Sequence, residues 1–355
     1  MFPLPAADIG TAAADVVSSV LQSLLTSRGI ASHYENLGYS PRDPEPRRWL
    51  SFEIGGQEYL FHDGHLLERG RDRWDRLERY LSEDDDALIA DKNGTKEMLA
   101  RHGFSTPRGK VFRRKNIQDA RAAFGKLPKP LCVKPNNGSH GDCTFPRITE
   151  RRWYNAALYR VAARYCRILV EQSVEGAVHR FFYVRPHVVA VKVLCPPRAT
   201  GDGKSTVADL LKALNAERRE RNLPLHTELD INDDDMCCAL ALQGYAPENI
   251  PEKGEVVRFS RVSNGSAGTV SINCLDKVHP GYLDLMAQAC DLFPSLQFAG
   301  IDVILRDRRE APSDDNHWIL EVNASPCAAT YYYPWGGEKI DVLSPLVDRL
   351  IELAT

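Results

Sequence analysis

The stretch "FAGIDVILRDRREAPSDDNHWILEVNASP" (residues 298–326) holds two short apolar segments joined by a polar connection. Each segment predicts a β-strand, and we expect the two to pair antiparallel around that connection. The start of the first strand then lies beside the end of the second. Because residues i and i+2 of a strand share a face, Glu321 and Asn323 are both expected to point toward Asp302.

Two carboxylates and an amide oxygen form an all-oxygen set of ligands. Such a set suits Mg²⁺ bound together with phosphate oxygens. Glu321 follows "WIL" and precedes Val322, so its charge is embedded in apolar sequence and needs a partner. The sequence therefore predicts a metal site at Asp302, Glu321 and Asn323.

Two lysines are the next candidates for site residues. Lys92 lies in "IADKNGTKEML" and Lys134 in "LCVKPNNGSHGD", each expected near the end of a β-strand. A desolvated ammonium needs an anion there. The loop at 136–141 is dense in Gly, Asn and Ser, and its backbone amides can close over phosphates. The lysines and this loop together predict a phosphate-binding site.

A weaker signal lies in "ILVEQSVEG" (168–176). A strand that leaves its apolar run at Glu171 can present the backbone of Gln172 and Val174 to a purine edge. Arg180 and Arg261 are candidates for contacting a transferring phosphoryl group or a carboxylate. Taken singly, each arginine is more typical of a plain surface position.

The segment "ATGDGKST" (199–206) resembles half of a phosphate-binding P-loop. That loop requires G-x-x-x-x-G-K-[ST], but Arg198 stands where the first glycine is needed. Pro196 and Pro197 precede it, where a buried strand would have to run. The segment is therefore not a P-loop, and "NGSAG" (264–268) lacks the first glycine of a hydrolase nucleophile elbow.

Composition restricts the class of protein. The chain has 355 residues, 43% of them hydrophobic and 26% charged, which is typical of a globular protein with two or three compact units. A formal net charge of −3 gives no electrostatic footprint for nucleic acid or an anionic membrane. No long apolar run or secretory signal is present, and nine scattered cysteines without a C-x-x-C pair suit a reducing cytosol. We therefore expect a cytoplasmic protein.

Alternating strand and helix patterns predict an α/β or α+β fold. The segment 86–103 reads as a strand end, a turn and a helix that stops at Gly103. Helices are expected at 10–30, 153–165, 207–222, 281–293 and near 341–353, and strands at 47–54, 57–64, 130–135, 166–174, 181–194, 297–307 and 317–326.

Nine stretches occur in the same order as in the ATP-grasp carboxylate–amine ligases, and the chain resembles that family from about residue 86 to residue 326. The resemblance is strongest to the branch of cyanophycin synthetase and next to bifunctional glutathione synthetase. The stretches are "DKNGTKEMLARHGFSTPRG", "VKPNNGSHGD", "VEQSVEGAVHRFF", "PPRATGDGKSTVADLLKALN", "LQGYAPENIPEKGEVV", "SNGSAGT", "VHPGY", "AGIDVIL" and "LEVNASP".

The resemblance implies an α+β protein with the ATP-grasp fold, in which two α/β subdomains grip ATP. A small pre-ATP-grasp α/β domain would occupy residues 1–88 and the ATP-grasp domain residues 89–355. Within the latter, about 110–176 would form a small nucleotide-lid subdomain and about 177–355 a larger subdomain with the TGDG insertion.

The activity implied by the resemblance is ATP-dependent formation of an amide or peptide bond on an amino acid or short peptide, through an acyl phosphate. A carboxylate kinase that uses the same ATP site, or a D-alanine–D-alanine-type ligase, is the alternative. A stand-alone grasp of this kind would perform one ligation. The family uses ATP with two Mg²⁺ ions, which Mn²⁺ can replace, and a homodimer is expected.

The resemblance also assigns roles to residues. Asp302, Glu321 and Asn323 would hold the metal, while Arg261, Arg180 and Lys134 would act on the moving phosphoryl group. The nucleotide would be bound by Lys92, Lys134, Asn136, Gly138, Ser139, His140, Gly141, Glu171, Gln172, Val174, His179 and Leu320. The substrates would contact Asn264, Ser266, Gly268, Lys192 and Ser325.

Two departures from the family pattern concern the substrates. Val178 stands where related ligases carry an acidic residue for the ribose, with Glu175 and His179 nearby. "VLC" (193–195) replaces a basic pair and a glutamate, and Lys192 just before it is the cation that can compensate. The aromatic segment "YYYPWGG" (331–337) either walls the substrate pocket or packs a C-terminal turn.

Overall fold

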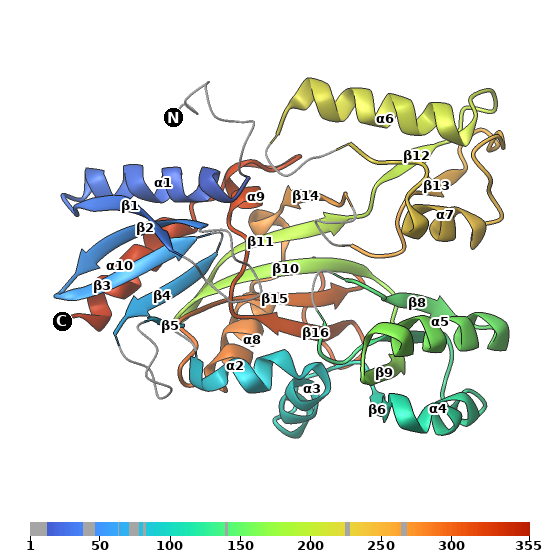
Figure 1. Ribbon diagram of the computed structural model, residues 1–355, viewed down its shortest axis with the longest axis horizontal. Helices are drawn as coiled ribbons and strands as arrows, with labels where there is room; N and C mark the ends of the chain where they lie inside the picture. Colours follow the sequence, from blue (N-terminus) through green and yellow to red (C-terminus); the bar gives the residue numbers. More distant parts are fainter. Residues whose placement is uncertain are drawn as a thin grey trace.

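The computed structural model describes most of the chain, and Figure 1 shows how its elements are arranged. The described residues are 13–37, 47–62, 64–70, 78–80, 83–138, 141–223, 228–263 and 268–355.

The N-terminal part is an antiparallel sheet covered by one helix. Helix α1 (Ala13–Ser27) precedes five strands that pair in chain order, so the expected helix and hairpin are confirmed. The hairpin turns at Gly55 and Gly56, whose φ angles of 61° and 83° fit a two-residue turn that glycine forms without strain. The strands are β1 (Ser32–Leu37), β2 (Arg47–Ile54), β3 (Gln57–His62), β4 (His65–Arg69) and β5 (Glu78–Tyr80).

Two short helices follow, α2 (Glu83–Ala90) and α3 (Lys92–Arg101). The strand end expected near residue 86 is therefore wrong, because this apolar run continues a helix. The Asp91 side chain accepts the backbone N–H of Gly94 and caps α3. Lys92 consequently stands in the first turn of a helix and not at the end of a strand.

The next unit is a four-stranded antiparallel sheet in the order β6-β9-β7-β8, packed against α5 around its own apolar core. It falls within the segment expected as the nucleotide lid, and we call it the lid. Its elements are β6 (Gly109–Arg113), the 3₁₀ turn η1 (Arg114–Asn116), α4 (Ile117–Ala123), β7 (Leu131–Pro135), β8 (Phe145–Ile148), α5 (Arg151–Arg164) and β9 (Arg167–Gln172).

The central sheet is antiparallel throughout, in the order β14-β11-β10-β15-β16. One face packs on α8, and apolar side chains from β10, β11, β15 and β16 fill that layer. The elements are β10 (Ala177–Val184), β11 (His187–Cys195), β14 (Val270–Asn273), the 3₁₀ turn η3 (Leu275–Lys277), α8 (Pro280–Asp291), β15 (Phe298–Leu305) and β16 (His317–Asn323). The antiparallel pairing of β15 with β16 confirms the expectation from residues 298–326.

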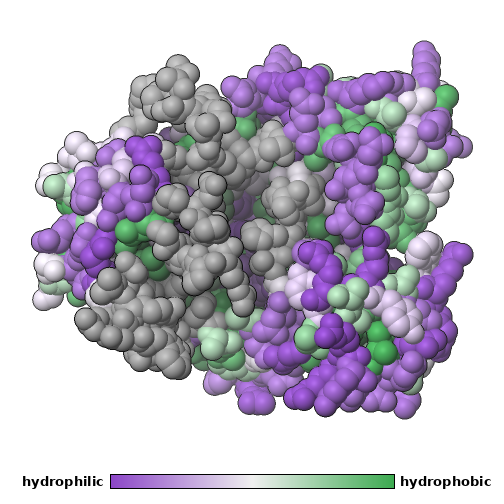
Figure 2. Space-filling model, viewed as in Figure 1, coloured by the Kyte–Doolittle hydropathy of each residue, from purple (hydrophilic) through white to green (hydrophobic). Residues whose placement is uncertain are grey.

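Between β11 and β14 the chain forms a small separate layer, which we call the insertion. It has its own apolar cluster, and it contains β12 (Arg198–Thr200), α6 (Val207–Arg221), α7 (Asp234–Ala241) and β13 (Val256–Arg258). In Figure 1 the insertion lies above the lid on the right side of the molecule. Figure 2 shows hydrophilic side chains over most of the outward surface of both.

The C-terminal helices close the other face of the central sheet. α9 (Ala329–Tyr332) and α10 (Leu343–Leu353) share one apolar cluster with α1, with β2 to β4 and with the ends of β10, β11 and β15. The N-terminal sheet and the C-terminal helices are thus held by the same core. Within the described residues, no helix combines the length and apolarity that crossing a membrane requires.

The shared core generates a stability prediction for α10. Leu350 is 1% exposed in this cluster, whereas its neighbour Ile351 is 38% exposed. We expect Leu350→Ala to lower the free energy of unfolding by about 2–5 kcal/mol, because it leaves a cavity. Ile351→Ala should change it by less than about 0.5 kcal/mol. Urea unfolding of both variants checks this, and equal losses would contradict the assignment of α10 to the core.

Candidate active site

The site begins with two carboxylates on neighbouring strands. Asp302 of β15 is the register partner of Glu321 of β16, and the register shifts directly after this pair, where Val303 pairs with Ile319. Leu320 is the extra residue of this β-bulge. Without the bulge Glu321 would share the face of Ile319, which is buried against the α8 layer. The bulge turns Glu321 onto the face of Asp302, and Asn323 Nδ2 lies 3.5 Å from Glu321 Oε1.

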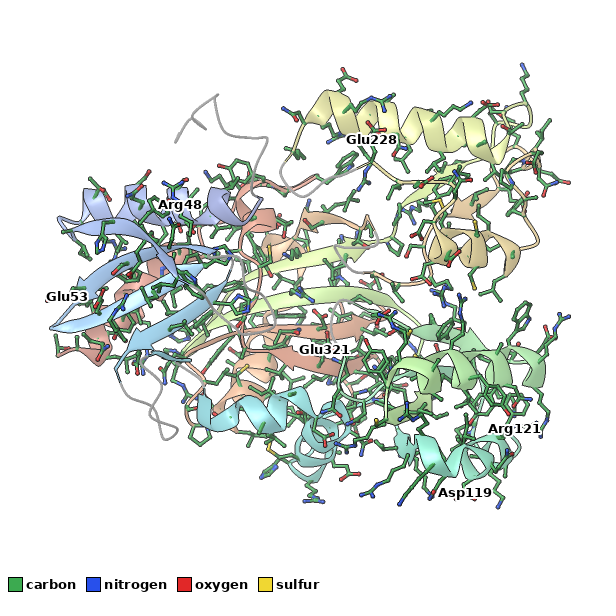
Figure 3. All side chains as sticks on the ribbon, in the orientation of Figure 1. Arg48, Glu53, Asp119, Arg121, Glu228 and Glu321 are labelled. Atoms are coloured by element: carbon green, nitrogen blue, oxygen red, sulfur yellow. The ribbon has the colours of Figure 1, made fainter. Side chains whose placement is uncertain are left out.

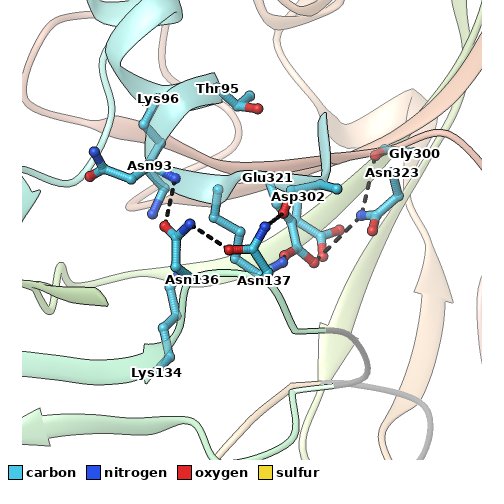
Figure 4. A network of polar contacts seen from close by, with 12 residues as sticks. Asn93, Thr95, Lys96, Lys134, Asn136, Asn137, Gly300, Asp302, Glu321 and Asn323 are labelled. Atoms are coloured by element: carbon cyan, nitrogen blue, oxygen red, sulfur yellow. Dashed lines mark hydrogen bonds and ion pairs between the residues drawn. The ribbon is translucent and has the colours of Figure 1, made fainter. Parts of the chain in front are cut away.

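Each carboxylate is paired with a cation. Arg180 of β10 donates to both oxygens of Asp302, from Nε at 2.6 Å and from Nη2 at 2.7 Å. Lys92, in the first turn of α3, forms an ion pair with Glu321. Figure 3 places Glu321 near the middle of the molecule, over the central sheet, and Figure 4 shows it between Asp302 and the residues of α3 and the lid.

The pKa values of the two carboxylates are shifted in opposite directions. Burial raises the pKa of Asp302, which Arg180 offsets in part, and the adjacent Glu321 raises it further. Burial also opposes ionisation of Glu321, but Lys92 and then Lys134 outweigh it and lower the pKa of Glu321 to about 2. The surrounding cations thus favour the charged form of Glu321, whereas burial and the neighbouring Glu321 disfavour the charged form of Asp302.

A row of polar side chains crosses the central sheet from this pair. Arg180 is the register partner of Asp302 on one side and of Lys192 on the other, and Lys192 is the partner of Asn273. We call Glu321, Asp302, Arg180, Lys192 and Asn273 the polar row. All five lie on the face opposite α8, since their strand neighbours belong to the α8 core.

The lid contributes a second buried cluster of charges. Lys134 of β7 lies 2.6 Å from Glu171 Oε1 of β9, and Lys96 of α3 is ion-paired with the other oxygen of Glu171. These three residues are each at most 8% exposed. Burial lowers the pKa of Lys96 to about 8 in spite of Glu171. For Lys134 the attraction of Glu171 outweighs burial and raises the pKa, and Glu321 adds to it.

Lys96 was not among the residues expected in the site. The signal for it is present in "DKNGTKEML", since Lys92 and Lys96 are four apart and share one face of a helix. It was missed because the segment was read as a strand end, a turn and then a helix, so Lys92 and Lys96 were not placed together on one helix face. The cluster has two cations for one anion, which leaves positive charge beside the carboxylate pair.

The start of the 136–141 loop is tied to α3. Asn136 is fully buried, its Nδ2 donates to Asp91 Oδ1 at 2.8 Å, and its Oδ1 accepts the backbone N–H of Asn93 at 3.1 Å. Figure 4 shows Asn136 and Asn137 facing α3. Gly138 and Gly141 follow, the latter with a φ of 66°. Ser139 and His140 lie outside the described residues.

Four of the residues expected to bind nucleotide lie at the end of β9, in the link to β10, in β10 and in β16. The backbone N–H of Gln172 donates to Arg108 O at 2.9 Å, and Val174 follows it in the link to β10. Leu320 is the half-buried bulge residue described above. His179 is 2% exposed and points to the face opposite Arg180, so it lies in the α8 layer and away from the polar row.

Arg261 connects the insertion with the lid. Its guanidinium donates to Thr144 O at 3.2 Å, lies 4.2 Å from the ring centroid of Phe145, and is ion-paired with Asp235 of α7. Arg261 therefore contacts the lid at residues that follow the 136–141 loop closely in the chain. None of these three contacts is with the carboxylate pair or the polar row.

The residues expected to bind substrate are only partly described. Gly268 has a φ of 73°, its carbonyl accepts from Arg218 at 3.0 Å, and a Cβ there would overlap Leu229. Ser325 is half-buried two residues after β16. Lys192 belongs to the polar row. Asn264 and Ser266 lie outside the described residues.

The backbone N–H groups at the TGDG turn are hydrogen-bonded to the side chain of Asp202, a residue of the same turn. Asp202 accepts the backbone N–H groups of Lys204 at 2.8 Å and Ser205 at 2.7 Å, and these bonds lower its pKa to about 2. Thr206 then caps α6. The amides that a P-loop would offer to phosphate are thus used within the turn.

The donor set at the carboxylate pair fits a hard divalent cation. Asp302, Glu321 and Asn323 supply oxygen ligands of the kind that Mg²⁺ prefers. Within the described ranges, no three His, Cys, Asp or Glu side chains group as a metal site, so this set depends on the amide oxygen of Asn323. The side chains of Lys92 and Glu321 are 15% and 25% exposed, which leaves them within reach of a ligand.

No model of a known protein family matches the chain. Comparison with individual known proteins, however, finds relatives. The cyanophycin synthetase of Synechocystis sp. is 32% identical over 275 residues, which cover 76% of this chain and 31% of that protein. The bifunctional glutathione biosynthesis protein GshAB of Clostridium perfringens is 26% identical over 269 residues, covering 74% of this chain and 34% of that protein. The chain thus spans about a third of the length of these relatives.

Among solved structures, the bifunctional glutathione synthetase of Pasteurella multocida superposes with a TM-score of 0.58 at 21% identity. The match covers 94% of this chain and 44% of that one. It shows a common fold that extends over nearly all of the chain, including the N-terminal sheet.

The burial of His179 generates a prediction about pH. Burial, with a smaller effect of Arg308, lowers the pKa of His179 to about 4. The unfolded chain, with a histidine pKa near 6.5, therefore binds this proton more strongly, and stability is lost as pH falls from 6.5 toward 4. We expect wild type to lose about 2 kcal/mol between about pH 7 and about pH 5 through this group.

His179→Leu should remove that part of the pH dependence of unfolding, measured by urea titration at the two pH values. His187→Leu is the matched control, because His187 is exposed at the start of β11. An unchanged pH dependence in His179→Leu would show that this imidazole does not titrate differently in the folded protein.

Proposed function

Because the chain has the ATP-grasp fold and is a homologue of the ATP-grasp ligases cyanophycin synthetase and GshAB, we propose that it is an ATP-dependent carboxylate–amine ligase. Its substrates would be an amino acid or short peptide and an amine. The observation that carries the proposal is the pair Asp302–Glu321, flanked by Arg180, Lys92 and Lys134. A site for a triphosphate and a carboxylate must contain both anions for metal and cations for phosphate.

Binding of ATP would use the cations of the lid and of α3. Lys134 and Lys92 would release part of their contact with Glu171 and Glu321 and bind α- and β-phosphate oxygens. Lys96 would act as a positioning residue, because it holds Glu171 and through it the direction of Lys134. Gln172, Val174 and Leu320 lie at the edge where the purine would be held between the lid and the central sheet.

Asp302, Glu321 and Asn323 would hold divalent metal, for which we propose two Mg²⁺ ions. When bound, Mg²⁺ supplies positive charge that offsets repulsion between the triphosphate and the incoming carboxylate. Lys92 and Arg180 perform part of this task in the structure as it stands, since each already neutralises one carboxylate.

The reaction would proceed in two steps. An oxygen of the substrate carboxylate attacks the γ-phosphorus, the bond to the β-phosphate oxygen breaks, and an acyl phosphate and ADP form. The neutral amine then attacks the acyl carbon, inorganic phosphate leaves, and the nitrogen loses a proton to give the amide. Arg180 would stabilise the charge on the transferring phosphoryl group, and Arg261 would join it from the lid side.

The remaining residues would surround the substrates. The loop at 136–141 would exclude water, which otherwise hydrolyses the acyl phosphate. Asn264, Ser266, Gly268 and Ser325 would line the acceptor side. We propose the domain boundary near residue 88 and the lid at about 110–176, and a homodimer stays a prediction from the family.

The first prediction for this function concerns turnover. The protein incubated with ATP, Mg²⁺ and pools of amino acids and dipeptides should release ADP and form a new amide, detected by mass. Glu321→Gln should lower kcat at least about 100-fold, because a group that stabilises charge in the transition state is lost. Glu310→Gln is the control, since Glu310 is exposed in the turn between β15 and β16.

A stable phosphorylated acid in place of an amide would instead indicate a carboxylate kinase. A product made only from D-alanine would favour the D-alanine–D-alanine-type reaction. ATP turnover that is unchanged in Glu321→Gln would remove the assignment of the metal site.

The second prediction concerns nucleotide affinity. Lys134→Met should raise KM for ATP at least about tenfold, since one charge-assisted hydrogen bond contributes about 1.5–3 kcal/mol. The fold should persist, because Glu171 keeps its pairing with Lys96. Lys126→Met, at an exposed position of the same unit, is the control. Equal KM values in the two variants would show that Lys134 does not contact the nucleotide.

A further inference from the structure

Lys192 is a buried cation without an anionic partner. It is 2% exposed in β11, its Nζ donates to Thr330 Oγ1, and it lies 3.9 Å from the ring centroid of Tyr331. Within the part of the chain that the structure describes, no carboxylate forms an ion pair with it. An ammonium in such surroundings is unfavourable unless an anion compensates it.

The polar row places both a cation and an anion near Lys192. Burial lowers the pKa of Lys192 to about 7, and Arg180 on the next strand adds to this lowering, whereas Cys327 and Asp302 oppose it. On its other side lies Asn273, which is 3% exposed and whose Oδ1 has no hydrogen-bond donor among the described residues. Because Asn273 Nδ2 already donates to Tyr331 O and Glu338 O, Asn273 offers only an acceptor here, and Lys192 is the group at this end of the row that can bind an anion.

We propose that Lys192 binds a carboxylate of the substrate other than the one that is phosphorylated, so that the enzyme selects a substrate with a second acid group. The identity of the substrate rests on the proposed ligase function. The site itself rests on Lys192 and its contact with Thr330. The carboxylate would approach along the row from Arg180, whose side chain is 20% exposed, and replace the Thr330 hydroxyl at Nζ.

The geometry of the sheet limits the size of such a substrate. Arg180 and Lys192 are register partners on adjacent strands, which lie about 5 Å apart, so a substrate that contacts both side chains can be as short as a small diacid. That distance is roughly the separation of the two carboxyl groups in succinate or glutarate. The second acid group therefore belongs either to a donor of that size or to the acceptor that attacks beside it.

A purely structural role makes a different prediction. If Lys192 only ties α9 to the sheet through Thr330, then removing either side chain should destabilise the protein. If Lys192 awaits an anion, its replacement by an apolar residue of similar length should leave stability unchanged or raise it, because a buried unpaired charge is removed. Thr330→Val would then preserve or strengthen anion binding, since the competing hydroxyl is lost.

The first experiment needs no ATP. Binding of succinate, glutarate and the monoamide succinamate is measured by calorimetry and by thermal shift on wild type, Lys192→Met and Thr330→Val. We expect the diacids to bind wild type and Thr330→Val at least about tenfold more tightly than succinamate. Lys192→Met should lose this difference without a lower melting temperature. Equal diacid preference in Lys192→Met, or its loss in Thr330→Val together with lowered stability, would overturn the inference.

The second experiment identifies the substrate that carries the acid group. In the ligation assay, aspartate and glutamate are compared with asparagine and glutamine as donors, and amino acids with their carboxamides as acceptors. Wild type should prefer the acid in one of the two comparisons by at least about tenfold in kcat/KM, and Lys192→Met should lose that preference.

The two proposals fail differently. If no ligation occurs with any pool but succinate binding depends on Lys192, the anion site stands and the ligase function does not. If ligation occurs and Lys192→Met keeps the same acid preference as wild type, the ligase function stands and the anion site is rejected.

Discussion

Two carboxylates side by side on one face of the central sheet repel each other, and the site depends on how this repulsion is offset. The carboxylate of Asp302 accepts hydrogen bonds from two guanidinium nitrogens of Arg180, Nε and Nη2. Glu321 is ion-paired with Lys92, which comes from a different part of the chain. The sheet, α3 and the lid therefore meet where negative charge is concentrated. Any ligand of this site must exchange these ion pairs for its own charges, which is the requirement for binding a metal–triphosphate complex.

The bulge in β16 is the local feature that creates this pair. It adds Leu320 between Ile319 and Glu321, so that Ile319 stays in the α8 core while Glu321 faces Asp302. A regular strand could not satisfy both, because residues two apart share a face. The single inserted residue Leu320 thus allows β16 both to pack against α8 and to place Glu321 beside Asp302.

The lid is attached through polar contacts in place of a shared apolar core. Its own core is separate, and its connections to α3 include the buried triad of Lys96, Glu171 and Lys134 and the bonds of Asn136 to Asp91 and Asn93. Such contacts are directional and fix orientation. They also include the cations that face Glu321, so the position of the lid and the charge of the site change together.

The sequence alone determined the paired C-terminal strands, the oxygen set of Asp302, Glu321 and Asn323, and most helices, because these follow from apolar periodicity and from charges embedded in apolar runs. It did not determine the helix at 83–90, since a short apolar run fits a strand end or a helix turn equally. Nor did it reveal Lys96 or the face of His179, which depend on which elements pack together. The tertiary structure decided the polar row, because the order β14-β11-β10-β15-β16 brings together residues from 180 to 321 that no spacing along the chain relates. Strand order and register are set by long-range packing, so a side chain's partners across a sheet can be known only once the sheet is formed.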